Sequence, residues 1–445
     1  MKEENKTQQS IPATKVQRAM KFVTTGAKVG KNYMKHYAKK IVDPKVSREN
    51  LHEDNANDIY EALSELKGSA LKVAQMMSMD KNLLPRAYAN KFQRSQYSAP
   101  PLSYPLVVKT FQKHFGKSPS EMFDTFTQEA VNAASIGQVH QATLQGKKLA
   151  VKVQYPGVAD SVRSDLKMVR PFASRLLRVN EKDVDYYMDE VESMLLSETD
   201  YDLELQRSIK LSQTCMASIA NVSFPTYYPE YSSTKVLTMD WLEGKHIDQF
   251  MADNPSQERC NQIGQALWDF YNFQVHELRE VHADPHPGNF ILQDNGTLGI
   301  IDFGCVKEIP DEFYYRYFPM INIHILEHPE KLQKIFQDLN FIYPDDTAEE
   351  KKQLEAIFIQ MIKLLGKPFH NGTFDFGDEG YFNEVYAFGE ATSDTPILKN
   401  SKKARGSKHG LYVNRTYFGL YHLLHQLKAQ VNTQANWYED ILDHV

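Results

Sequence analysis

Two different spacings of hydrophobic residues divide this chain into helical and strand segments. In several stretches apolar residues recur at steps of three and four, which places them on one face of a helix. This spacing predicts helices over residues 14–41, 53–78, 105–116, 158–180, 182–217 and 258–280. Beyond Pro310 nearly the whole pattern is helical as well.

Strands are predicted where the spacing between apolar residues becomes shorter. The segment VNAASIGQVHQATLQGKKLAVKV, residues 131–153, predicts two strands joined by the turn Gln145-Gly146. Residues 235–240 predict one more strand, and residues 289–303 predict two short strands about the turn Asn295-Gly296. Helices and strands are thus segregated along the chain, which indicates an α+β fold.

The order of these elements predicts the domain organisation. Residues 1–12 are expected to be a disordered tail, and residues 13–118 a helical extension. Residues 119–243 form a sheet-containing lobe with a helical insertion, and residues 244–445 form a helical lobe. A chain of 445 residues is long enough for two or three domains of ordinary size.

Charge is distributed unevenly. The chain carries a formal net charge of -6, but its first 50 residues hold 12 Lys and Arg against 4 Asp and Glu. Within this basic arm one helical face is apolar, formed by Val16, Met20, Val23, Ala27, Gly30, Met34, Tyr37 and Ile41. Such a helix either lies on an anionic membrane surface or packs on the protein's own core. No segment resembles a nucleic-acid-binding module.

Composition indicates the cellular compartment in which the protein is expected. The three cysteines lie far apart and form no C-x-x-C pair, which favours free thiols in a reducing compartment over a thiolate zinc site. No run of 18 apolar residues occurs, and the first ten residues lack the apolar core of a signal peptide. We therefore expect a cytoplasmic protein, with any membrane association peripheral.

Candidate chemistry is concentrated in VHADPHPGNFILQDNGTLGIIDFG. Asp284 is followed five residues later by Asn289, and Asp302 begins a D-F-G triplet. Protein kinases use this pair of motifs to hold Mg²⁺ ions on the nucleotide phosphates, and a carboxylate and an amide oxygen are ligands that Mg²⁺ prefers. The sequence predicts Asp284 as the catalytic base, with Asn289 and Asp302 as metal ligands.

A nucleotide-binding loop and lysine are predicted upstream. Leu149-Ala150-Val151-Lys152 matches the strand whose lysine pairs with the phosphates in kinases. The preceding loop, residues 132–139, overlays the glycine-rich loop but keeps only its third glycine, Gly137. The expected partner of Lys152 is Glu204 on a following helix. No A-P-E motif follows the D-F-G triplet, and residues 305–327 contain no Ser or Thr, so docking of a protein substrate in the usual way is disfavoured.

These motifs resemble those of the UbiB/AarF family of atypical protein-kinase-like ATPases, over roughly residues 11–310. The alanine-rich loop characteristic of that family is matched by Ala133, Ala134, Ser135, Ile136, Gly137, Gln138 and Val139. Its K-x-G-Q motif is matched by Lys72-Val73-Ala74-Gln75, with alanine in place of glycine, and its E-x-D motif by Glu198-Thr199-Asp200.

The resemblance implies a bilobal kinase-like fold whose N-terminal helical extension covers the nucleotide cleft. It implies ATP and Mg²⁺ as cofactors, with Ala133, Ala134, Ser135, Gly137, Val139, Lys152, Glu204 and Gln75 near the nucleotide and Lys72 paired with Glu198. It further implies a function in ubiquinone or other isoprenoid-lipid biosynthesis, with quinone-like lipids and other lipid-biosynthesis proteins as partners. In a eukaryote the location would be an organelle.

Two alternatives of different classes remain at this stage. A nucleotide-binding scaffold without turnover would keep the same cleft and act as a switch in a lipid-biosynthesis assembly. A metal-dependent hydrolase would use His282, Asp284 and His286 as ligands of a transition metal, because alternating residues on a strand or turn can converge on Zn²⁺. The second alternative leaves the D-F-G triplet unexplained.

Overall fold

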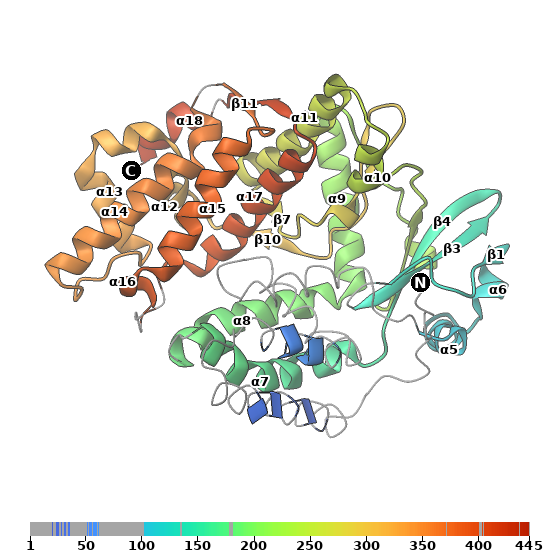
Figure 1. The fold of residues 1–445 in the computed structure, drawn as a ribbon. Coiled ribbons are helices and arrows are strands. Elements are labelled where there is room, and N and C mark those ends of the chain that lie inside the picture. The colour runs from blue at the N-terminus through green and yellow to red at the C-terminus, as the bar shows by residue number, and fades with distance from the viewer. Residues whose placement is uncertain are drawn as a thin grey trace. The chain divides into compact units, whose positions relative to one another are not determined.

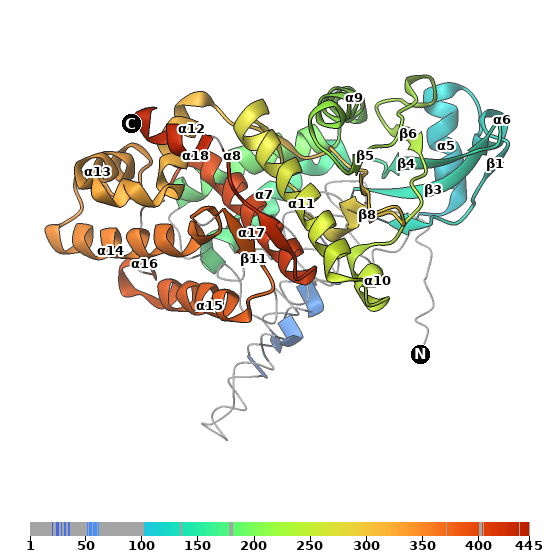
Figure 2. The same cartoon turned by 90° about the horizontal axis from the view of Figure 1, so that it is seen from above.

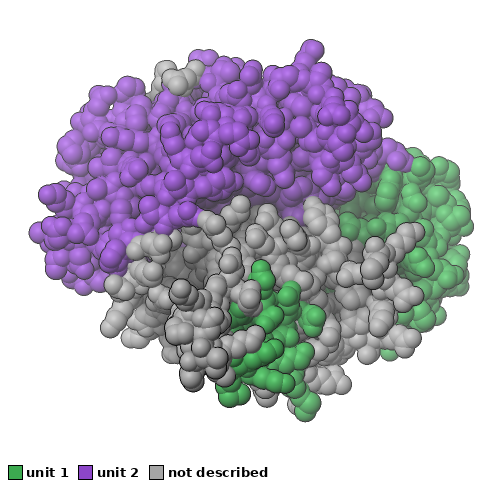
Figure 3. Space-filling view, in the orientation of Figure 1, with its two compact units in different colours: residues 1–177, 184–207, 226–241 green, residues 178–183, 208–225, 242–445 purple. Residues whose placement is uncertain are grey.

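A computed structural model describes residues 102–133, 136–177, 181–370, 372–399, 403, 405–435 and 437–444, together with scattered helical positions between residues 20 and 61. These residues belong to two compact units, coloured separately in Figure 3. Unit 1 comprises residues 1–177, 184–207 and 226–241, and unit 2 comprises residues 178–183, 208–225 and 242–445. The predicted tail 1–12 and most of the predicted extension lie outside the described residues.

Unit 1 is built on one antiparallel sheet of five strands in the order β1-β3-β4-β6, with β2 paired to β3. The strands are β1 Thr125–Phe126, β2 Asn132–Ala133, β3 Gly137–Leu144, β4 Lys147–Gln154 and β6 Val236–Asp240. Gln145 and Gly146 join β3 to β4 with positive φ angles of 51° and 78°, the backbone that a two-residue hairpin requires. The predicted hairpin and the predicted third strand are therefore confirmed.

Helices α5 Tyr104–Phe115 and α6 Pro119–Met122 precede this sheet (Figures 1 and 2). On α5 the fully buried Val107 and Phe111 contact Val151 of β4 in one apolar cluster. The helix ends where Gly116 adopts a left-handed conformation, φ 68°, and donates its N–H to the carbonyl of Gln112. The predicted helix over 105–116 is confirmed, and it covers the core of the sheet.

Three helices form the insertion between β4 and β6. They are α7 Val158–Leu177, α8 Glu181–Glu198 and α9 Tyr201–Ser218. The prediction of one continuous helix over residues 182–217 is wrong, because the chain leaves the helix at Thr199 and Asp200. The Asp200 carboxylate accepts the N–H of Leu203 at 3.2 Å and so caps the start of α9.

Unit 2 is mainly helical and is organised around α11 Gln257–Phe273, which buries Ile263, Leu267 and Phe270 completely. The other helices of this unit are α10 Ile247–Ala252, α12 Asp311–Tyr317, α13 Pro329–Asp338, α14 Ala348–Leu365, α15 Glu379–Asp394, α16 Pro396–Lys399, α17 Lys408–Gln426 and α18 Trp437–Asp440. Helix α17 runs beside α11 in both ribbon views (Figures 1 and 2).

Short strands complete unit 2. Antiparallel pairs form between β7 Glu280–His282 and β10 Val306–Glu308 and between β8 Phe290–Leu292 and β9 Leu298–Ile300, and β5 Val222–Ser223 lies parallel to β9. The two strands predicted about Asn295-Gly296 are confirmed. One further pair, β11 Thr373–Asp375 with β12 Gln430–Asn432, lies in a region that the sequence pattern assigned to helices.

The cysteines and the lengths of the helices bear on two expectations from the sequence, free thiols and no membrane-spanning segment. All three cysteines, Cys215, Cys260 and Cys305, are thiols outside disulfides, as expected, and the structure shows that all three are buried. Within the described part of the chain, the helices are all too short or too polar to cross a bilayer.

Candidate functional site

The predicted phosphate-pairing lysine makes a buried ion pair. Lys152 lies within β4, and its Nζ is 2.7 Å from Oε1 of Glu204 on α9, the partner expected from the sequence. The side chains are only 10% and 1% exposed, so neither charge is well solvated. A buried pair of this kind fixes the position of the ammonium, because moving either charge away would leave its partner unpaired in a medium of low polarity.

Tyr201, which sequence reasoning missed, lies beneath this pair. It is fully buried, and Nζ of Lys152 lies 5.0 Å from the centre of its ring, within cation–π range. Tyr201 precedes Glu204 by three residues on α9, so both side chains project from the same helical face. This three-residue spacing alone does not single out Tyr201 in the sequence.

Tyr201 also explains why the loop keeps its third glycine. A Cβ at Gly137 would lie 2.7 Å from the Tyr201 hydroxyl and 2.9 Å from the carbonyl oxygen of Val153. Neither distance is compatible with ordinary packing. The need for glycine here therefore comes from close packing inside unit 1.

The rest of the predicted loop is described in part. Asn132 and Ala133 form β2 and pair with Val139 and Gln138 of β3. Val139 also lies opposite Lys152 in the β3–β4 register, which brings this predicted nucleotide-binding residue next to the lysine. Ala134 and Ser135 lie outside the described residues.

The E-x-D segment between α8 and α9 is attached to the sheet. The Thr199 carbonyl accepts Nε2–H of Gln154 at 2.9 Å and an Nζ proton of Lys235 at 3.2 Å. Burial lowers the pKa of the Lys235 ammonium from its ordinary value. Glu198 is buried at 4% exposure, but its expected partner Lys72, like Gln75, lies outside the described residues.

In unit 2 the predicted catalytic loop is closed by hydrogen bonds. The Asn289 amide nitrogen donates to the carbonyl oxygen of Asp284 at 2.9 Å, and the Ala283 N–H donates to the carbonyl of Cys305 at 2.8 Å. Because Asn289 uses its amide nitrogen in this bond, its side-chain oxygen is the atom that can ligate a cation. The loop thus ties Asp284 to Asn289 and anchors both to the segment after the D-F-G triplet.

The D-F-G triplet is fixed by its phenylalanine. Phe303 is fully buried, with its ring centre 5.8 Å from that of Phe224 and 6.3 Å from that of Phe270. Oδ1 of Asp302 accepts the N–H of Gly304 at 2.7 Å, which orients the carboxylate at the loop. These contacts fix the position of Asp302, because the neighbouring Phe303 is buried in the hydrophobic core.

Arg415 also belongs to this group, although it was absent from the sequence-based prediction. Its Nη2 lies 2.7 Å from Oδ1 of Asp284, and both side chains are mostly buried, at 11% and 18% exposure. The two residues are 131 positions apart, on a loop and on α17. No local pattern marks an arginine of this kind, so only the tertiary structure reveals it.

The residues of this group fit Mg²⁺ rather than a transition metal. One carboxylate and one amide oxygen, from Asp302 and Asn289, suit a hard cation whose remaining ligands come from phosphates and water. Among the described residues, no three His, Cys, Asp or Glu side chains converge as a metal-binding group. The zinc alternative also conflicts with His286, whose Nδ1 accepts the N–H of Gly288 at 3.0 Å.

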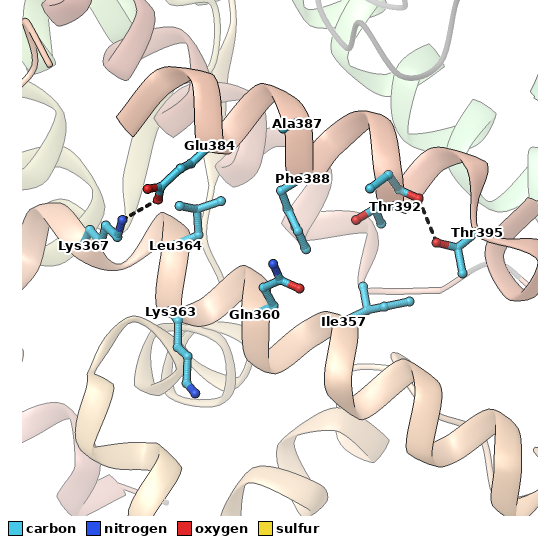
Figure 4. A pocket seen from close by; sticks show the side chains of 11 residues that line it. Ile357, Gln360, Lys363, Leu364, Lys367, Glu384, Ala387, Phe388, Thr392 and Thr395 are labelled. Carbon is cyan, nitrogen blue, oxygen red and sulfur yellow. Dashed lines mark hydrogen bonds and ion pairs between the residues drawn. The ribbon is translucent and has the colours of Figure 1, made fainter. Parts of the chain in front are cut away.

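A cavity elsewhere in unit 2 contains none of the predicted site residues. It measures about 580 Å³ and lies between α14 and α15 (Figure 4). An ion pair of 2.6 Å between Lys367 and Glu384 spans one end, and Thr395 donates to the carbonyl of Ala391 at 2.9 Å at the other. Phe388 and Leu364 contribute apolar walls, so this hollow differs in chemistry from a phosphate site.

The fold is that of a protein kinase: an antiparallel sheet holds a buried Lys–Glu pair, and a helical unit holds the D-x-x-x-x-N and D-F-G loops. Residues 94–336 match the family model described as the ABC1 atypical kinase-like domain. That match covers more than half of the chain, which therefore belongs to this family. The resemblance stated from the sequence is confirmed.

Individual relatives agree with this assignment. The chain is 27% identical to the probable serine/threonine-protein kinase abkA of Dictyostelium discoideum, over 95% of this chain and 78% of that one. It is 24% identical to the mitochondrial atypical kinase COQ8B of Danio rerio, over 98% of this chain and 69% of the relative. The protein is thus an enzyme of the atypical kinase or ATPase class.

A solved structure supports the fold directly. The structure of Rv3197 in complex with erythromycin, from Mycobacterium tuberculosis, superposes with a TM-score of 0.56 at 27% identity. The match covers 86% of this chain and 95% of that one. The two proteins therefore share a fold over most of this chain.

Proposed function

We propose that this protein binds Mg-ATP and turns it over in support of ubiquinone or other isoprenoid-lipid biosynthesis. The observation that carries the proposal is the buried pair of Lys152 with Glu204, in a chain that also holds Asp284, Asn289 and Asp302 on anchored loops. In kinases these groups have separate roles: the lysine binds phosphate, the asparagine and second aspartate hold metal, and the first aspartate accepts the acceptor's proton. A relative named COQ8B supports the lipid-biosynthetic setting.

The acceptor is proposed to be a small lipid-like molecule or water, in preference to a protein. After the D-F-G triplet the chain forms β10 and then α12, and residues 305–327 contain no Ser or Thr that could be phosphorylated. This segment therefore cannot carry the phosphoserine or phosphothreonine that orders the activation loop of many kinases for a peptide substrate.

The basic N-terminal helix is proposed to lie on an anionic membrane surface. Met20 and Met34, both on its predicted apolar face, are 63% and 70% exposed. Among the described residues of this arm, the polar Asn32 contacts the next helical stretch, donating at 2.8 Å to Asp58. The exposure of these two apolar side chains, in a segment rich in lysine, favours a lipid surface over a core-packing role.

Turnover is tested by following phosphate release from ATP by the purified full-length protein in Mg²⁺. We expect Mg²⁺-dependent release that Asp284→Asn lowers by about 10²–10⁴-fold, to a measurable residual rate, while nucleotide binding persists, because Asp284 is proposed as the proton acceptor and not as a phosphate or metal ligand. Nucleotide binding without any release by the parent would favour the alternative, a scaffold that binds nucleotide without turnover.

The membrane proposal is tested with the same protein and with vesicles of phosphatidylcholine, with and without phosphatidylglycerol. We expect binding only to the anionic vesicles, weakening steeply with salt, and a loss of binding in Met20→Asp/Met34→Asp. Met216→Asp is the matched control, since Met216 is also exposed, at 52%, but lies on α9. Equal binding by the two variants would contradict the membrane proposal.

A further inference from the structure

One face of α17 contacts the catalytic loop and its flanking strand. Tyr412, Arg415 and Gly419 follow one another at steps of three and four, so they lie on one side of the helix. The Tyr412 ring lies 5.7 Å from Nζ of Lys307 on β10, and Arg415 pairs with Asp284. This face is distinct from the one that carries the fully buried Leu420 and Leu424 into the core.

Gly419 allows the helix to approach the loop closely. A Cβ at this position would lie 2.1 Å from Cγ and 2.7 Å from Cβ of Pro285, the residue that follows Asp284. Any larger residue would therefore push α17 and the loop apart. The backbone of α17 lies directly against Pro285, and this contact fixes the distance between Arg415 and Asp284.

The position of α17 is set by contacts that do not involve the loop. The Tyr417 hydroxyl forms a 2.9 Å hydrogen bond with Nε2 of His276, and the Tyr421 hydroxyl donates to the carbonyl of Leu365 at 3.1 Å. Burial raises the pKa of the Tyr417 hydroxyl well above its ordinary value, so it stays protonated and neutral. Arg415 is consequently presented by a rigid helix, and its ion pair can hold Asp284 in one orientation.

The charge of Arg415 also matters at this place. The loop DPHPGN, residues 284–289, contains no lysine or arginine of its own. The residues matched by the family model end at position 336, so the arginine comes from a helix beyond them. A mostly buried carboxylate with a guanidinium at 2.7 Å is strongly oriented, since charge-assisted hydrogen bonds are shorter and stronger than neutral ones.

We propose that Arg415 is a positioning residue for phosphoryl transfer, which it serves by holding the carboxylate of Asp284 toward the attacking group. The inference rests on the proposed function. In the step that it supports, the proton of the attacking water or hydroxyl passes to Asp284. The new phosphorus–oxygen bond then forms at the γ-phosphate as the bond to ADP breaks. Arg415 touches neither reacting oxygen and acts only through Asp284.

The test compares Arg415→Met and Arg415→Lys with the parent in steady-state ATP turnover. Loss of orientation by about 1 Å costs roughly 10²-fold in rate, so we expect kcat of Arg415→Met to fall by about that factor. KM for ATP and the thermal shift with Mg-ADP should stay near the parental values. Arg415→Lys should recover part of kcat, because it restores the charge without the planar geometry.

Arg405→Met is the matched control. Arg405 is 10% exposed and pairs with the buried Asp346 at 2.9 Å, so its loss removes a similar ion pair at another place in unit 2. This variant should keep parental kcat even if its melting temperature falls. In an Asp284→Asn background, Arg415→Met should cause no further loss of rate.

The outcomes separate the two claims. Parental turnover with equal kcat in Arg415→Met and Arg405→Met would overturn the role of Arg415 and leave the proposed function intact. An additional loss in the Asp284→Asn background would overturn the claim that Arg415 acts through Asp284. A parent without turnover would overturn the proposed function and, with it, this inference. If Arg415→Met does not fold, Arg415→Lys decides, and parental kcat in that variant would contradict the positioning role.

Discussion

Lys152 and Glu204 form a buried ion pair across 52 residues of sequence, joining the central strand β4 to the first turns of α9. Because the intervening residues form two further helices, the pair depends on how the insertion returns to the sheet. The attachment of Thr199 to Gln154 and Lys235 secures that return one turn before Glu204. The geometry of the lysine is thus linked to the E-x-D segment.

Removing the lysine should destabilise the protein strongly. Lys152→Ala leaves the Glu204 carboxylate buried without its counter-charge, and we expect a loss of about 3–5 kcal/mol in the free energy of unfolding. Lys152→Met/Glu204→Leu should recover most of that loss and still lack ATP turnover. Urea unfolding measures the free energy of unfolding of both variants, and phosphate release measures ATP turnover. The exposed pair of Arg163 with Glu192 is the control, for which Arg163→Ala should cost about 0–1 kcal/mol.

A loss in Lys152→Ala as small as in Arg163→Ala would show that the ion pair of Lys152 and Glu204 is effectively solvated.

Gly137→Ala should destabilise unit 1 through a steric clash. The added methyl group meets the Tyr201 hydroxyl and the Val153 carbonyl, and overpacking of this kind costs about 1–3 kcal/mol. Tyr201→Phe removes the nearer of the two atoms, so Gly137→Ala/Tyr201→Phe should be more stable than the sum of the single changes predicts. Strict additivity of the three unfolding free energies would exclude Tyr201 as the reason for glycine at this position.

Lys72, in the predicted helical extension, is expected to restrict which phosphoryl acceptor can react. Lys72 lies outside the described residues, and its role follows from the K-x-G-Q resemblance and from the buried Glu198 that it is expected to pair with. Lys72→Ala should permit autophosphorylation that the parent lacks and leave nucleotide binding largely intact. Incubation with radiolabelled ATP tests this, with Lys67→Ala as the control. Identical labelling and identical ATPase rates in the parent and Lys72→Ala would show that Lys72 has no place in the active site.

Much of the fold could be predicted from the sequence because its signals are local. The β3–β4 hairpin follows from alternating residues and the turn at Gln145-Gly146, and β8 and β9 follow from the turn at Asn295-Gly296. The end of α8 could not be predicted from periodicity, since the apolar spacing continues through Thr199 and Asp200. There the capping bond of Asp200 outweighs the helical pattern.

The candidate site was predictable to the extent that motifs mark it. Glu204 could be named because a kinase lysine requires a glutamate partner, and the structure places it at 2.7 Å. Tyr201 and Arg415 could not be named, because their contacts with Gly137 and Asp284 join segments far apart in the sequence. Packing and ion pairing over such separations depend on tertiary structure and leave no local pattern.

Binding of nucleotide together with Mg²⁺ is expected to depend on Asp302, the predicted metal ligand of the D-F-G triplet. A ligand that binds only the folded state raises stability with the logarithm of its concentration relative to Kd, by about 2.7 kcal/mol at 100 Kd. The measurement is the thermal shift of the full-length protein with ATP and Mg²⁺, for the parent, Asp302→Asn and Asp294→Asn. Asp294 is an exposed residue of the turn between β8 and β9 and serves as the control. We predict a Mg²⁺-dependent shift in the parent and in Asp294→Asn, and none in Asp302→Asn. An undiminished shift in Asp302→Asn would contradict the kinase-type assignment of this carboxylate.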